Sequence, residues 1–134
     1  MTAFSDFLEA AILNHFFRNT DIGAPPANVY IGLYTSATDD ASGGTEVTGG
    51  SYARATVSTT SQWSAPGAGG LTDNINDIVF ATATANWGTI THVAIADAIT
   101  GGNRLFHGAL AASKVVNSGD IFKFLVGALD ITLA

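Results

Sequence analysis

Three histidines are the side chains in this sequence best suited to proton transfer or metal binding near neutral pH. They are His15, His92 and His107. A zinc-protease helix needs two histidines four residues apart, and His15 has no such partner. His92 and His107 fall on two predicted strands and approach each other only if those strands pair across the turn between them. We interpret the histidines as cross-strand or core side chains and predict no metal site.

Motifs for nucleophilic catalysis or phosphate binding are missing. No serine lies in a G-x-S-x-G elbow, where a strained turn would expose its hydroxyl. The glycine pairs have neither the following lysine of a phosphate loop nor the strand-to-helix context of a dinucleotide site. We therefore predict a protein that is not an enzyme, has no catalytic residue and binds no cofactor.

Two acidic segments contain the hard oxygen ligands that Ca²⁺ prefers. Asp39 and Asp40 lie in a glycine-rich stretch, and residues 73–77 read DNIND. The second segment resembles the start of a calcium loop, but Ile75 stands where the third-position ligand is needed, and no glycine follows at the sixth. We interpret both segments as turns.

One amphipathic helix is predicted at about residues 4–18. Ser5 is its expected N-cap, and Asp6 and Glu9 suit the positive end of the helix dipole. Two interpretations remain for its apolar face, which either closes the open end of a β domain or docks into a partner subunit. The apolar positions recur at spacings of three and four: Phe4, Phe7, Leu8, Ala11, Ile12, His15 and Phe16.

The rest of the chain, about residues 28–134, alternates short β-branched runs with glycine, asparagine and serine clusters. Six to eight short strands at this spacing predict a mainly β fold, an antiparallel β-sandwich or barrel of jelly-roll type with one N-terminal helix. We predict a single domain over residues 1–134. Loops at about 36–50 and 64–70 are its longest surface excursions.

Charge and composition exclude several functions. The 134 residues are 47% hydrophobic and only 12% charged, with a net charge of −6. A surface of this kind suits either subunit packing or an ordinary β domain. Five scattered basic residues cannot form the stripe that nucleic acid requires, and they also disfavour an anionic membrane. The absence of cysteine excludes disulfides and fits synthesis in a reducing cytosol, and the first residues do not read as a signal peptide.

Three segments carry a recognisable pattern in a fixed order. SDFLEAAILNHFFRN gives a helix, and VYIGLYTS followed by GGTEVTGGSYARATV gives a strand, a polar loop and a second strand. ANWGTITHVAIADA, TGGNRLFHGAL and KVVNSGDIFKF form the C-terminal half. Together these segments, from about Phe4 to Leu133, resemble a family of small structural proteins of tailed bacteriophages, commonly labelled tail-fibre or minor structural proteins. Some β-rich proteins of this size are capsid cement proteins.

This resemblance implies a virion protein that is made in the host cytoplasm and assembles with other virion proteins, either the major capsid protein or tail proteins. Our first hypothesis is a capsid cement or decoration protein that stabilises the shell by subunit packing and forms a homo-oligomer such as a trimer. The alternative is a tail-fibre or tail-tip component, with or without a contact to host glycan, in which case Trp63, Tyr34 and the long loops face outward.

The sequence also suggests which side chains meet a partner. Arg54 and Arg104 are rare positive charges on an acidic chain, and we expect each to form an ion pair within the chain or with a neighbouring subunit. The predicted interface residues are Phe4, Phe7, Phe16, Phe17, Asp39, Asp40, Tyr52, Arg54, Trp63 and Arg104.

Overall fold

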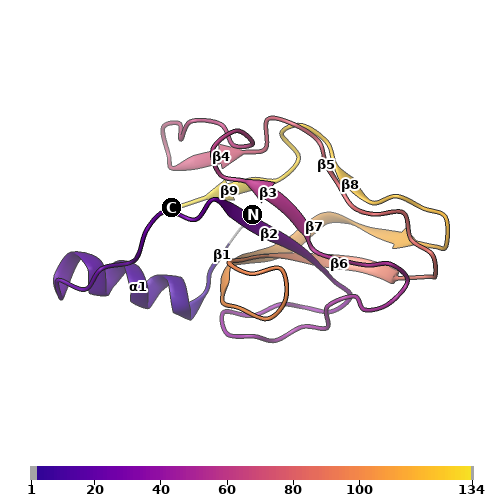
Figure 1. Ribbon diagram of the computed structural model, residues 1–134, viewed down its shortest axis with the longest axis horizontal. Coiled ribbons are helices and arrows are strands. Elements are labelled where there is room, and N and C mark those ends of the chain that lie inside the picture. Colours follow the sequence, from indigo (N-terminus) through magenta and orange to yellow (C-terminus); the bar gives the residue numbers. More distant parts are fainter. Residues whose placement is uncertain (1–2, 134) are drawn as a thin grey trace.

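The computed structural model describes residues 3–133 (Figure 1). Residues 1, 2 and 134 of the predicted 1–134 domain lie outside the described residues. The described chain is mainly β with one helix, as predicted. Its elements are β1 (Ala3–Phe4), α1 (Asp6–Phe17), β2 (Asn28–Tyr34), β3 (Ala55–Ser58), β4 (Leu71–Asp73), β5 (Ile78–Val79), β6 (Gly88–Ala96), β7 (Arg104–Val116), β8 (Lys123–Phe124) and β9 (Asp130–Thr132).

The strands form two layers around one apolar core. The main layer is an antiparallel sheet of five strands in the order β1-β7-β6-β2-β3, and two short pairs, β4-β9 and β5-β8, form the second layer (Figure 1). Side chains of both layers meet in one cluster, in which Ile31, Ile90 and Leu129 are fully buried. The antiparallel sandwich is therefore confirmed. The barrel alternative is not, because the described main sheet ends at β1 and β3 without closing.

The central strands β2 and β6 are buried on both faces. Residues 31–34 and 93–96 are buried without interruption, which is the pattern of a strand covered on both sides. The loop 36–50, which we call the β2–β3 loop, bonds through its backbone to Leu33 and Thr35 along the edge of β2, and at Gly44 it lies against the Tyr34 ring on the second face. Tyr34 is consequently only 6% exposed, so the expectation that it faces outward is wrong.

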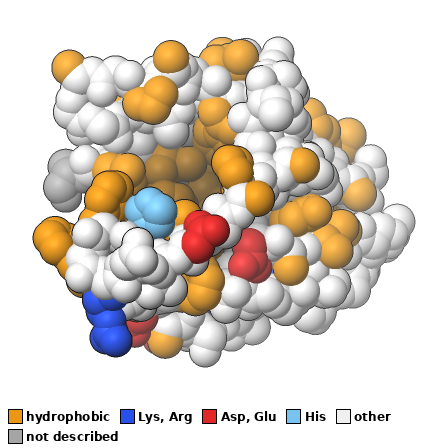
Figure 2. All heavy atoms as spheres, turned by 60° about the vertical axis from the view of Figure 1, so that its left-hand side comes forward, with side chains coloured by type: hydrophobic (Ala, Val, Ile, Leu, Met, Phe, Trp, Pro, Cys, Tyr) orange, Lys and Arg blue, Asp and Glu red, His pale blue; other side chains and the backbone are white. Residues whose placement is uncertain are grey.

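Helix α1 projects from the edge of the main sheet (Figure 1). Ser5 is the N-cap as predicted, because its Oγ accepts a hydrogen bond from the amide of Leu8 at 3.2 Å. The hydroxyl of Ser5 donates to the carbonyl of Arg104, and β1 pairs with β7, so the start of the helix is tied to the sheet. No residue of α1 is buried, and the helix therefore does not close the β core. Figure 2 shows this side of the molecule, with hydrophobic side chains around a hollow.

Candidate functional site

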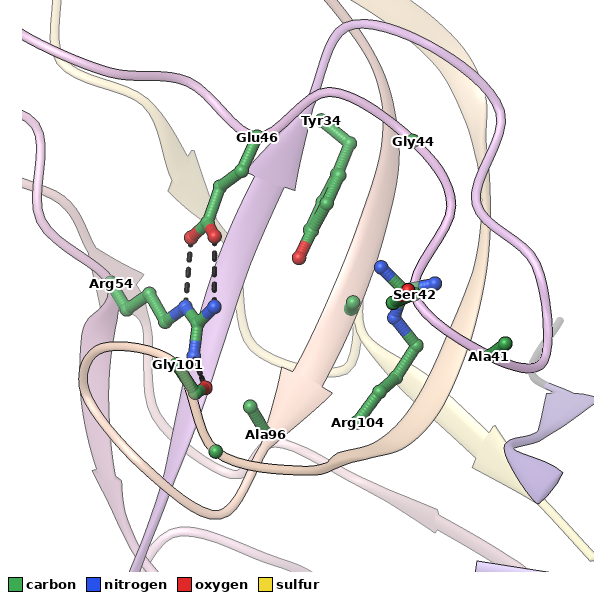
Figure 3. A pocket seen from close by; sticks show the side chains of 11 residues that line it. Tyr34, Ala41, Ser42, Gly44, Glu46, Arg54, Ala96, Gly101 and Arg104 are labelled. Carbon is green, nitrogen blue, oxygen red and sulfur yellow. Dashed lines mark hydrogen bonds and ion pairs between the residues drawn. The ribbon is translucent and has the colours of Figure 1, made fainter. Parts of the chain in front are cut away.

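A surface pocket of about 270 Å³ gathers two of the five basic residues of the chain, Arg54 and Arg104 (Figure 3). Its walls come from the end of β2, the β2–β3 loop, the start of β3 and the turn between β6 and β7. That turn contains Gly101 and Gly102, both with positive φ, as expected of a tight glycine turn. The lining residues are Tyr34, Ala41, Ser42, Gly44, Glu46, Arg54, Ala94, Ala96, Gly101, Gly102 and Arg104.

Arg54 ties three segments together. Its Nε and Nη2 donate to the two carboxylate oxygens of Glu46, both at 2.8 Å, which is the bidentate geometry of a strong ion pair. Its Nη1 donates to the carbonyls of Ala98 at 2.8 Å and Gly101 at 2.9 Å. The side chain of Arg54 is only 10% exposed and that of Glu46 is 24% exposed. The β2–β3 loop, β3 and the β6–β7 turn are thus joined through one guanidinium.

Tyr52 also bonds to Glu46 and connects it to β2. The hydroxyl of Tyr52 donates to its Oε1 at 2.9 Å and accepts from the amide of Leu33 at 2.9 Å. A Cβ atom at Gly32 would lie 2.9 Å from the same oxygen, so a side chain at this position would displace the carboxylate from its present place. Burial alone would raise the pKa of Glu46, but the hydrogen bonds from Arg54 and Tyr52 outweigh it and lower that pKa.

Arg104 holds the other side of the pocket. Its guanidinium lies 5.2 Å from the ring centroid of Tyr34 and donates to the carbonyls of Asp39 at 2.7 Å and Gly43 at 2.9 Å. The Asp39 carboxylate lies 3.6 Å away and accepts from the amide of Gly43. That hydrogen bond lowers the pKa of Asp39. The expected ion pairs of Arg54 and Arg104 therefore both form within the chain.

His107 joins the β2–β3 loop to β7. Its Nε2 lies 2.8 Å from Oδ1 of Asp40, and its Nδ1 lies 3.0 Å from the hydroxyl of Thr38. His92 is opposite Ala109, and His107 is opposite Ala94, so the two histidines lie two residues apart along the paired strands. Across residues 3–133 no three side chains of the metal-binding types come together.

The predicted interface residues fall into three places. Asp39, Asp40, Tyr52, Arg54 and Arg104 all hold the β2–β3 loop against the sheet. Phe4 packs edge-on against Phe106 in β7, whereas Phe7, Phe16 and Phe17 are exposed on α1. Trp63 is half-buried, with part of its side chain packed against the core. Whether these residues contact a partner stays a prediction.

Glu46 and Thr38 are the two pocket or loop-anchoring residues that sequence reasoning missed. Both lie in a polar, glycine-rich segment that reads as an open loop. One signal was present, because Glu46 is the one glutamate of the β2–β3 loop and precedes Arg54 by eight residues. A loop that returns to the adjacent strand would bring such a pair together, and the pairing of Tyr34 with Glu46 does so.

The lowered pKa of Glu46 predicts a pH-dependent stability. A carboxylate whose pKa falls on folding stabilises the protein above its unfolded value, 4.5, and this contribution is lost as pH falls through the folded value. We expect Glu46→Gln to be less stable than the wild type at pH 7, with a difference that narrows as pH approaches 3. Urea unfolding of both proteins across this range measures it. Glu9→Gln, at the exposed other glutamate, is the control, and a pH-independent difference for Glu46→Gln would contradict the assignment.

Comparison with known proteins gives one family. The family model described as Podophage GP4 fiber I protein gp80 matches residues 3–132. No curated protein matches the chain. Within the described residues, no helix combines the length and hydrophobicity needed to span a bilayer. Because the match covers nearly the whole chain, the protein belongs to the Podophage GP4 fiber I protein gp80 family and is a structural protein of the phage virion.

Proposed function

We propose that the chain is a non-catalytic subunit of a phage tail fibre, and that its β body acts as a rigid module among other virion proteins. The family description supports a fibre over the capsid cement of our first hypothesis, because it names a fiber protein. The rigidity of the β body is supported by the way the β2–β3 loop is held against the sheet. Arg54 and Arg104 both donate hydrogen bonds to acceptors of this same chain.

A braced loop suits a protein that works by packing. A loop fixed before assembly loses little conformational entropy when a partner covers it, so more of the contact energy remains as affinity. The exposed surface of the β2–β3 loop, which includes Asp40 and Ser42, then offers a preformed docking element. The partners are other virion proteins.

The hydroxyl–imidazole–carboxylate chain of Thr38, His107 and Asp40 is the arrangement closest to catalytic chemistry. Its three members span the β2–β3 loop and β7, and Asp40 is 58% exposed while His107 is 9% exposed. A hydrolase would need this hydroxyl to face a substrate pocket with oxyanion donors. The pocket between the two arginines is lined by other residues. We therefore propose that Thr38, His107 and Asp40 hold the β2–β3 loop against β7.

The fibre alternative, with its possible glycan contact, expected Tyr34 and Trp63 to face outward, and the structure removes Tyr34 from that role. Tyr34 is buried with the Arg104 guanidinium over its ring, and Trp63 lies against the core. The buried Tyr34 ring offers no open face for a sugar to stack on, and Trp63 is half-buried. The proposed role is therefore structural assembly within the fibre rather than receptor binding through Tyr34.

Location on the particle tests this proposal. Purified virions are labelled with gold-conjugated antibody raised against the chain, and intact particles, detached tails and emptied capsids are compared by electron microscopy. We expect gold on the tail fibres of intact particles and detached tails. Gold distributed evenly over the shell of tail-less capsids would overturn the fibre proposal in favour of a capsid cement protein.

A further inference from the structure

Strand β8 and the residues before it leave one edge of the second layer open. The amide of Phe80 donates to the carbonyl of Phe122 at 2.9 Å, and Val79 pairs with Lys123. Backbone groups alternate from side to side along a strand, so those of Ile121 and Lys123 point away from β5. Within residues 3–133 no strand pairs with this side of β8. We call the open side at Ile121 and Lys123 the β8 edge.

A groove of about 370 Å³ lies between the β8 edge and the end of β7. Residues 114–116 of β7 line one wall, and residues 120–123 with Leu125 line the other. The end of β7 is open as well, because β1 pairs with β7 only at Phe106 and His107. Neighbouring strands lie about 4.8 Å apart, so a strand added to the β8 edge would occupy this groove.

The side chains beside the groove are apolar or positively charged. Ile121 and Leu125 are each 55% exposed, and they lie on the same face as Lys123 because Phe122 and Phe124 between them point into the core. Lys114 lies on the opposite wall, in β7.

The two lysines differ from the arginines of the first pocket. Arg54 and Arg104 form ion pairs within the chain, whereas neither Lys114 nor Lys123 has one among residues 3–133. The acid of the groove, Asp120, accepts a hydrogen bond from the amide of Asn117 and is used in that turn. On a chain with a net charge of −6, two unpaired lysines in one groove fit a ligand that is negatively charged.

We propose that the β8 edge binds an extended segment of another virion protein that carries both apolar and acidic residues. The segment adds to β8 as a further strand, and its backbone bonds to that of Ile121 and Lys123. Its apolar side chains cover Ile121 and Leu125, and its carboxylates pair with Lys114 and Lys123. This proposal goes beyond the fibre function, and it holds wherever the chain lies on the particle.

A second copy of this chain fits the β8 edge poorly. Two β8 edges paired about a two-fold axis would bring the Lys123 side chains of both copies onto one pair of strands, and like charges facing each other across strands are unfavourable. The strand at the other end of the main sheet, β3, carries no acidic residue that could face the lysines. The proposed partner is therefore a different chain.

The first experiment measures whether the groove is covered in the particle. Lys114 and Lys123 are the only lysines of the chain, so each can be followed by mass spectrometry. Intact virions and isolated chain labelled with heavy nitrogen are acetylated in one tube with N-hydroxysuccinimide acetate. We expect both lysines to react at least tenfold more slowly in virions than in the isolated chain. Equal rates would mean that the lysines only guard an open edge against pairing, and would overturn the proposal.

Carbodiimide cross-linking of intact virions then identifies the partner. This reagent joins a lysine amine to a carboxylate with no spacer, so it reports only groups in contact. We expect Lys114 or Lys123 to be linked to aspartate or glutamate of another virion protein, in a segment that also carries apolar residues. Links to a second copy of this chain would overturn the assignment of the partner.

The second experiment tests pairing through the backbone. Ile121→Pro removes an amide that faces the open edge, whereas Ile121→Val keeps that amide and a β-branched side chain. Virions are grown with each variant supplied in place of the wild type, and the amount of the chain per particle is measured by mass spectrometry. We expect at least tenfold less of Ile121→Pro than of Ile121→Val. Circular dichroism and melting curves check that each variant is folded, and a folded Ile121→Pro incorporated normally would overturn strand addition.

Charge is tested separately, so that the result does not depend on the folding of the proline variant. Lys123→Glu reverses one charge of the groove, and Arg18→Glu makes the same change at an exposed position outside it. We expect at least a tenfold loss of incorporation for Lys123→Glu and none for Arg18→Glu. Equal incorporation of the two folded variants would overturn the acidic character of the partner.

Discussion

Replacing Asn74 with alanine is expected to lower the free energy of unfolding by about 4 kcal/mol. Asn74 is fully buried, and its Nδ2 donates to the carbonyls of Asn76 at 2.8 Å and Leu125 at 2.9 Å. Its Oδ1 accepts from the amide of Leu129 at 2.9 Å. The substitution removes three hydrogen bonds of about 1 kcal/mol each and leaves buried backbone groups without a partner, which adds about 1–3 kcal/mol. Urea unfolding followed by tryptophan fluorescence measures the loss.

The neighbouring Asn76→Ala is the matched control for this prediction. Asn76 is exposed, and it contributes to the Asn74 network through its backbone carbonyl, which the substitution keeps. We expect this variant to lose less than about 1 kcal/mol, as surface substitutions usually do. If Asn74→Ala and Asn76→Ala unfold at the same urea concentration, the Asn74 side chain does not join the two strand pairs of the second layer.

The role of Asn74 shows what a local sequence pattern leaves undetermined. The DNIND segment correctly predicts a turn, because asparagine and aspartate favour turns through their own side-chain hydrogen bonds. The residues that Asn74 holds, Leu125 and Leu129, lie more than 50 positions along the chain. Contacts at that separation depend on how the strand pairs β4-β9 and β5-β8 come together, and no spacing in the sequence encodes this arrangement.

Sequence patterns gave correct predictions for features that depend on a single helix or strand. Ser5 was identified as the N-cap of α1 because capping depends on the next three residues. The strand predicted for VYIGLYTS corresponds to β2, and the predicted strand that contains His92 corresponds to β6, since their long apolar runs require a central position in a sheet. β1 and β4 were missed because two or three residues show no periodicity.

The sequence predicted where the strands lie better than it predicted what covers their side chains. Alternation along β2 correctly places Tyr34 on the face opposite Leu33, but nothing local shows that the β2–β3 loop covers that face. The same loop supplies Glu46, the partner that Arg54 was expected to have but that the sequence did not identify.

Replacing Arg54 with methionine is expected to destabilise the protein by about 3 kcal/mol at pH 7. Methionine keeps much of the apolar stem but leaves the Glu46 carboxylate without its bidentate partner. Removing one member of a buried ion pair costs about 3–5 kcal/mol, and the partial exposure of Glu46 places this case at the lower end. Urea unfolding measures the change, and Arg18→Met, at the exposed C-cap of α1, is the control for loss of one arginine.

The double variant Arg54→Met/Glu46→Leu separates the ion pair from the other contacts of Arg54. Replacing a buried pair as a whole is often nearly neutral, whereas breaking it strands a charge. We therefore expect the double variant to recover at least half of the stability lost by Arg54→Met. If it recovers none, the loss comes from the carbonyls of Ala98 and Gly101, and the guanidinium acts mainly as a brace for the β6–β7 turn rather than as the counter-charge of Glu46.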